Sequence, residues 1–179
     1  MSARPAYLVR PCFQQDIEFV QLIYGHHVMT GTASFETEPP PREEIEARWS
    51  KVVTHGWPFL VASPTSDLTR VLGFAYAQQF REREAYQRTF EDSVYVAPSA
   101  LRRGIGKLLL GGLLQGLKDD GARKVLAVIG DSANKASIAV HASLGFRHVG
   151  VFKQVGFKFD RWLDVVLMQR SLRDGVEPN

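Results

Sequence analysis

A strand that runs into a glycine-rich helix start is the feature that most constrains the fold of this chain. Residues 92–107 read DSVYVAPSALRRGIGK, so an extended segment stops at Pro98 and a helix begins near Gly104 and Gly106. A helix start has about four backbone N–H groups without partners and a partial positive charge. Glycines let a ligand approach that backbone closely. Basic side chains surround the turn, namely Arg102, Arg103 and Lys107. The segment predicts a diphosphate site, with a tight turn bearing solvated arginines as the alternative.

Two common nucleotide motifs fail on single residues. A P-loop needs Ser or Thr after its lysine, but Lys107 is followed by Leu108. A dinucleotide fingerprint needs a third glycine, and that position holds Leu109. The diphosphate ligand therefore has to be identified from other residues.

Composition is that of an ordinary globular protein of 179 residues, with 45% hydrophobic and 23% charged residues. The net charge of +3 suits a small anionic ligand and is too dispersed for nucleic acid. Cys12 is the only cysteine, which excludes an intrachain disulfide and a cysteine metal site. No apolar run suggests a membrane span or a signal peptide, and we expect a cytoplasmic protein without a metal.

The hydrophobic pattern predicts one α/β domain over residues 1–179, with a core of about residues 6–172. Strands are expected at 6–10, 58–62, 71–80, 89–96, 124–129, 147–153 and 162–170. Helices are expected at 16–27, 42–54, 103–120 and 132–144. Hairpins make most strand pairs antiparallel, while the β-α-β crossover at 89–129 requires at least one parallel pair.

A second informative segment begins at Asn134 and ends in a Gly-Phe pair. On a helix, Asn134, Ser137, His141 and Leu144 lie on one face. Asn134 and Ser137 either meet a ligand or only cap the helix, and His141 is either functional or a packing histidine.

Together, RRGIG and the later N-x-x-S-x-x-x-H-x-x-x-G-F resemble the GCN5-related N-acetyltransferase (GNAT) family over nearly the whole chain. The resemblance implies a sheet of about seven mostly antiparallel strands with a splayed central parallel pair and four helices. It also implies acetyl-CoA as cosubstrate. The residues it assigns to acetyl-CoA are Val94, Tyr95, Val96, Arg102, Arg103, Gly104, Ile105, Gly106, Lys107, Asn134 and Ser137.

Longer matches, such as TASFETEP at 32–39 and GFKFDRWLD at 156–164, resemble the phosphinothricin and methionine sulfoximine N-acetyltransferase branch. That branch implies a homodimer that buries the region of Phe157 to Trp162. Leu101 and Asp160 depart from the family, which usually has Arg or Gln and Gly there. His141 stands where many members carry a tyrosine acid for the CoA thiolate.

The chemistry points to Glu91. An α-ammonium group is mostly protonated at pH 7, so acetyl transfer needs a base. Glu91 at the start of the cofactor strand is the candidate, unless it is a surface carboxylate. The N–H of Val94 is the expected oxyanion donor, and His141 is the expected thiolate acid or proton relay.

Arg81 and Arg83 are the expected anchors for an anionic substrate, with Phe35 and Tyr86 as walls. The alternative for the two arginines is a solvated charged loop, and the alternative for the two aromatic residues is ordinary core packing. The predicted reaction is N-acetylation of phosphinothricin, methionine sulfoximine or methionine sulfone. A different amine (a polyamine, an aminoglycoside or a protein N-terminus) and a non-catalytic CoA-binding sensor are the alternatives.

Overall fold

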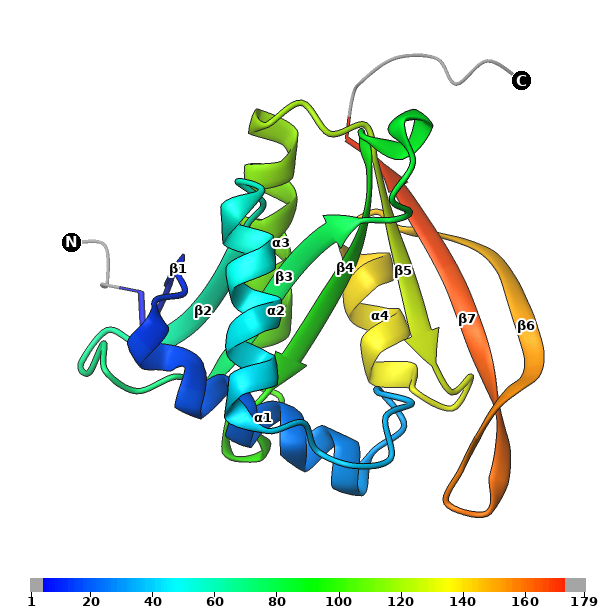
Figure 1. The fold of residues 1–179 in the computed structure, drawn as a ribbon, viewed down its shortest axis with the longest axis horizontal. Coiled ribbons are helices and arrows are strands. Elements are labelled where there is room, and N and C mark those ends of the chain that lie inside the picture. Colours follow the sequence, from blue (N-terminus) through cyan, green and yellow to red (C-terminus); the bar gives the residue numbers. More distant parts are fainter. Residues whose placement is uncertain (1–4, 173–179) are drawn as a thin grey trace.

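One mixed sheet organises the chain. The computed structural model describes residues 5–172 and arranges seven strands in the order β1-β2-β3-β4-β5-β7-β6 (Figure 1). The strands are β1 Tyr7–Pro11, β2 Phe59–Pro64, β3 Gly73–Gln79, β4 Thr89–Val96, β5 Lys124–Gly130, β6 Arg147–Lys158 and β7 Arg161–Ser171. Only β4 and β5 pair in parallel within this sheet. The predicted sheet and its parallel pair are confirmed.

Four α-helices cover the two faces of the sheet. They are α1 Ile17–Thr30, α2 Arg42–Thr54, α3 Ile105–Asp119 and α4 Lys135–Ser143. Side chains of a strand alternate between faces, so each face builds its own core. The α1 and α2 helices pack over Phe59 and Phe74, and α3 packs its leucines against Phe90. The α4 helix adds partly buried apolar side chains to the α3 side.

Element ends differ from the sequence prediction where the backbone turns left-handed. The α3 helix begins at Ile105 instead of residue 103, because Gly104 has φ of 78°. The α4 helix begins at Lys135 instead of residue 132. Asp131 has φ of 69° there, and its carboxylate accepts a hydrogen bond from the N–H of Ala133 at 2.9 Å. The β6 strand continues past residue 153 to Lys158 through two register irregularities.

The central strands part halfway along their length. The β4 and β5 strands pair from Thr89↔Lys124 to Asp92↔Ala127 and no further. Beyond that point β4 stays with β3 as far as Val96↔Gly73, while β5 stays with β7. The predicted splay therefore opens directly after Asp92.

Within residues 5–172, no helix combines the length and apolar character needed to cross a membrane. The same part of the chain contains no group of three or more His, Cys, Asp or Glu side chains arranged to hold a metal ion.

Candidate active site

A narrow cavity of about 50 Å³ opens where β4 and β5 part, and we call it the cleft. It is lined by Ala33, Asp92, Ser93, Val94, Tyr95, Ala127, Val128, Ile129, Gly130, Asn134, Ser137 and His141. The walls are the two strands, and α4 crosses the gap between them (Figure 1). The structure therefore brings together Val94, Asn134, Ser137 and His141, as the sequence predicts.

Val94 turns its backbone toward the cleft. Residues of β4 with odd numbers exchange hydrogen bonds with β3, as shown by Phe80 N–H to Thr89 O at 3.0 Å and Ala97 N–H to Leu72 O at 2.8 Å. Antiparallel pairing alternates, so Val94 directs its N–H and C=O away from β3. Because Val94 also lies past the last residue paired with β5, these groups face the cleft.

Neighbouring β4 residues have other partners. The Tyr95 ring packs in the core against Tyr24 and Phe74, and the residue also borders the cleft. The carbonyl of Val96 accepts a hydrogen bond from Nε2 of His27 at 2.9 Å. Sequence reasoning missed His27, because nothing in its own segment indicates a contact with β4.

The first turn of α3 is open toward the outside. Gly104 has no atom within 4 Å of the position where a Cβ would stand, and Arg102, Arg103 and Lys107 are exposed around it. Ile105 is buried and anchors the helix start in the core. Arg102 has φ of 60°, so the loop bends sharply just before the helix. The open first turn and its basic side chains have the arrangement that the predicted diphosphate cradle requires.

Asn134 caps α4, because its side-chain oxygen accepts a hydrogen bond from the N–H of Ser137 at 3.2 Å. Both residues also line the cleft. The two sequence interpretations of Asn134, as a cap and as a ligand contact, are therefore compatible.

His141 pairs with Asp92 at the end of the cleft where β4 and β5 part. Its Nε2 lies 2.9 Å from Oδ2 of Asp92, and both side chains are buried. Burial acts to lower the pKa of His141, but the hydrogen bond and charge of Asp92 outweigh it, so the pKa is raised. Sequence reasoning missed Asp92. The available signal was a charged residue on the face of β4 that also carries Phe90, Val94 and Val96.

Both ring nitrogens of His141 face acceptors. Nδ1 lies 2.7 Å from the carbonyl oxygen of Ser137, which can only accept, so Nδ1 carries a proton. A second proton lies between Nε2 and Asp92 Oδ2, since two bare lone pairs at 2.9 Å would repel. Neither nitrogen is free to reach a ligand, so the pairing gives no support to His141 as a direct acid.

Glu91 points to the opposite face of β4 from Asp92 and is partly buried. Burial raises the pKa of Glu91, the charge of Arg81 opposes this rise, and the charge of Asp92 adds to it. A carboxyl group whose pKa is raised by burial beside the cleft strand is a stronger base than an exposed one, as a general base requires.

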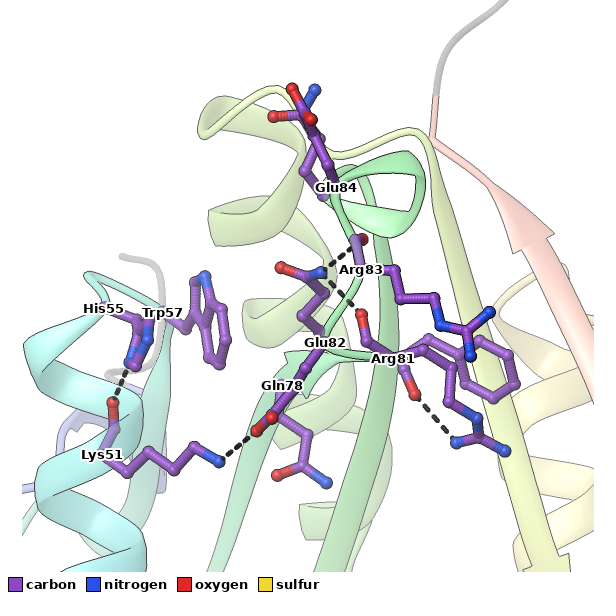
Figure 2. A pocket seen from close by; sticks show the side chains of 11 residues that line it. Lys51, His55, Trp57, Gln78, Arg81, Glu82, Arg83 and Glu84 are labelled. Carbon is purple, nitrogen blue, oxygen red and sulfur yellow. Dashed lines mark hydrogen bonds and ion pairs between the residues drawn. The ribbon is translucent and has the colours of Figure 1, made fainter.

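Arg81 and Arg83 line a larger pocket of about 670 Å³ between the end of α2 and the 80–87 loop (Figure 2). Figure 2 shows both guanidinium groups pointing to the same side, with Arg81 lying over the Phe80 ring at 4.2 Å. Glu82, which lies between them in the sequence, points instead toward Lys51 and contacts it at 2.8 Å.

Phe35 and Tyr86 lie outside that pocket. Tyr86 packs edge-on against Phe80, and Phe35 packs against Gly130 and Gly156 at the β5 end of the cleft. The Phe35 loop is held by Lys158, whose Nζ donates to the carbonyl oxygens of Gly31 at 3.0 Å and Ser34 at 2.8 Å. The predicted substrate residues are thus distributed over two places rather than one.

Comparison with known proteins agrees with this geometry. The acetyltransferase (GNAT) family profile matches residues 23–146. A phosphinothricin N-acetyltransferase from Alcaligenes faecalis is 49% identical over 97% of this chain and 86% of its own length. An L-methionine sulfoximine/L-methionine sulfone acetyltransferase from Pseudomonas aeruginosa is 35% identical over 92% of this chain and 94% of its own.

A solved structure shows the same fold with the cosubstrate bound. The GNAT superfamily phosphinothricin acetyltransferase from Sinorhizobium meliloti, in complex with acetyl-CoA, superposes with a TM-score of 0.91 at 38% identity. The match covers 98% of this chain and 94% of that one. The chain is an N-acetyltransferase that belongs to the GNAT family, in its phosphinothricin and methionine sulfoximine acetyltransferase branch.

Proposed function

We propose that the protein transfers the acetyl group of acetyl-CoA to the α-amino group of phosphinothricin, methionine sulfoximine or methionine sulfone. The observation that carries the proposal is that Glu91, with a raised pKa, immediately precedes the residue where the cleft opens. One strand thus offers a base on one face and the Val94 amide at its edge. The names of the relatives support the substrate class. The proposal takes residues 1–179 as a single domain with its core at about residues 6–172.

Acetyl-CoA fits the open end of the cleft. The first turn of α3 offers backbone N–H groups and the basic side chains of Arg102, Arg103 and Lys107 to the pyrophosphate. The pantetheine arm of acetyl-CoA then runs along the backbone of Val96, Tyr95 and Val94, with Asn134 and Ser137 on the other side. The bound acetyl-CoA of the Sinorhizobium meliloti relative supports this assignment. Leu101 is 52% exposed beside the cradle, and nothing in the structure explains why it replaces Arg or Gln.

Catalysis follows from three groups. Glu91 removes a proton from the substrate ammonium, directly or through water, so that the neutral amine attacks the thioester carbonyl. The N–H of Val94 stabilises the oxyanion of the tetrahedral intermediate. When the intermediate collapses, the carbon–sulfur bond breaks and CoA leaves as a thiolate, which takes up the proton that the acetylated nitrogen loses. Arg81 and Arg83 bind the substrate carboxylate and its second polar group by charge-assisted hydrogen bonds.

The proposal includes a homodimer. Apolar side chains of the β6–β7 hairpin are more than half exposed, namely Val149, Phe152, Val155, Phe157 and Trp162. The β6 strand is also the edge of the sheet. Such an edge is usually covered in a stable protein. Sedimentation should give a dimer for the natural chain and a monomer for Trp162→Arg.

Release of free thiol from acetyl-CoA tests the function. The three amino-acid analogues should be turned over, while a polyamine and an aminoglycoside should not. Turnover of the cationic amines instead would assign the enzyme to a different substrate class. Binding of acetyl-CoA without turnover of any amine would identify a CoA-binding sensor and refute the proposal.

A further inference from the structure

The Asp92–His141 pair joins α4 to β4 at the point where the cleft begins. Asp92 is the last β4 residue that pairs with β5, and His141 lies in the second half of α4. The other end of α4 is attached to the β5 side. The N–H of Asp131 donates to the Asp164 carbonyl at 2.8 Å, and the hydroxyl of Ser132 donates to the Asp164 carboxylate at 2.8 Å. The helix is therefore fixed to β4 through His141 and, through the loop that precedes it, to β7 next to β5.

Asp92 depends on His141 for its burial. The side chain of Asp92 is 1% exposed. Among the buried side-chain nitrogen and oxygen atoms of the described residues, its Oδ1 is the one without a hydrogen-bond partner. A buried carboxylate with a single partner is costly when that partner is lost. The polar contact between β4 and α4 thus contains a titratable proton.

Few charged groups act on this pair. Asp92 is the charged group that influences His141, together with the Ser137 carbonyl on the same helix. The β5 residues of the cleft are Ala127, Val128, Ile129 and Gly130, and Phe146 packs edge-on against the imidazole ring at 5.0 Å. Glu91 lies next to Asp92 in sequence and on the opposite face of β4.

We propose that Asp92 is a positioning residue that acts through His141: the pair holds α4 against β4 and so keeps the cleft in the shape that binds the acetyl-CoA arm. The proposal rests on the proposed function, because it places acetyl-CoA in the cleft. Since Asn134 and Ser137 lie on the helix that the pair fixes, movement of α4 carries them away from the arm. Loss of the shared proton leaves Asp92 opposite a bare nitrogen, so binding of acetyl-CoA weakens as pH rises.

Calorimetric titration with a thioether analogue of acetyl-CoA, which cannot be hydrolysed, tests the proposal from about pH 6 to about pH 10. The natural protein should bind less tightly toward alkaline pH. Asp92→Ala leaves Nε2 of His141 without its partner and should bind at least about tenfold less tightly at pH 7, which is the effect of losing one hydrogen bond to a charged group. The double variant Asp92→Asn/His141→Gln restores a neutral hydrogen-bonded pair. It should recover most of the affinity and lose the pH dependence.

A matched control is Asp16→Ala. Asp16 is also a buried aspartate in an ion pair, with Arg10 at 2.7 Å, and it lies outside the cleft lining. Its variant should bind the analogue like the natural protein. Asp92→Ala that binds like Asp16→Ala at every pH would overturn the proposal. If Asp92→Ala does not fold, the double variant decides: a natural pH profile in that variant also overturns it.

The inference and the proposed function fail in different ways. A natural protein that binds the analogue but acetylates none of the three amines refutes the substrates, and the binding data still decide the role of Asp92. Normal acetylation together with unaltered binding by Asp92→Ala refutes the role of Asp92 alone.

Discussion

The ring of Phe35 occupies the space in which a side chain at Gly156 would stand. A Cβ at Gly156 would fall within 2.9 Å of Cζ of Phe35 and nearer still to other atoms of the ring. Gly130 is in a similar position, with Cε1 of Phe35 at 2.9 Å. Two glycines from β5 and β6 thus seat the loop that contributes Ala33 to the cleft.

Gly156→Ala should therefore displace Phe35 and lower the free energy of unfolding by about 1–3 kcal/mol, as overpacking does elsewhere. Urea denaturation measures the change. Gly150→Ala is the control, because Gly150 lies on the same strand and has no atom within 4 Å of its Cβ position. Equal stability losses in the two variants would contradict the seating role of Gly156.

The sequence predicted the elements whose hydrophobic period is strong. The leucines of α3 repeat every turn, and Leu109, Leu113 and Leu117 are fully buried, as the period requires. Hairpins and the single crossover were also predictable, because connection length limits how strands pair. Helix starts at Ile105 and Lys135 were not, since they depend on left-handed residues at Gly104 and Asp131.

Side-chain partners distant in sequence were the other limit. The spacing of Asn134, Ser137 and His141 predicted a shared helix face, and the structure places all three on the cleft. No local pattern in the sequence could show that Asp92 would be buried and would form an ion pair with His141. The same holds for Phe35. Its neighbours Gly130 and Gly156 lie on β5 and β6, which are distant from Phe35 in the sequence.

Asp160, where the family resemblance led us to expect glycine, lies in a turn whose geometry gives a reason to test it. Phe159 and Asp160 form the two-residue turn between β6 and β7, with φ of 53° and 55°. A turn with two positive φ values favours glycine at its second position. Asp160→Gly should raise the free energy of unfolding by about 1 kcal/mol, the cost of a left-handed L-residue. Asp160→Ala is the comparison in the same urea experiment. A loss of stability in Asp160→Gly would contradict this account of the turn.

Arg81 should affect the pH dependence of acetylation as well as substrate binding. Its charge opposes the burial that raises the pKa of Glu91. Arg81→Gln therefore raises that pKa further. The part of the pH profile in which kcat/KM increases should move to higher pH. Arg83→Gln is the matched control, because Arg83 is not among the charges that act on Glu91. Both variants should raise KM for the amino acid, and a shift of the limb in both would remove the special role of Arg81.

Glu91→Gln tests the base itself. A base works only when ionised, and burial raises the pKa of Glu91 above the usual value of 4.5, so activity should increase as pH rises through that raised pKa. The variant cannot ionise. We expect kcat to fall by about 10²–10⁴-fold and the limb due to this group to disappear, while the affinity for acetyl-CoA stays the same. Stopped-flow or steady-state assays across pH, with calorimetry for the cosubstrate, measure both quantities. Glu18→Gln, an exposed carboxylate on α1 away from both pockets, is the control and should leave kcat unchanged. Natural kinetics in Glu91→Gln would assign the proton transfer to another group, and reduced acetyl-CoA affinity would place Glu91 in cosubstrate binding instead.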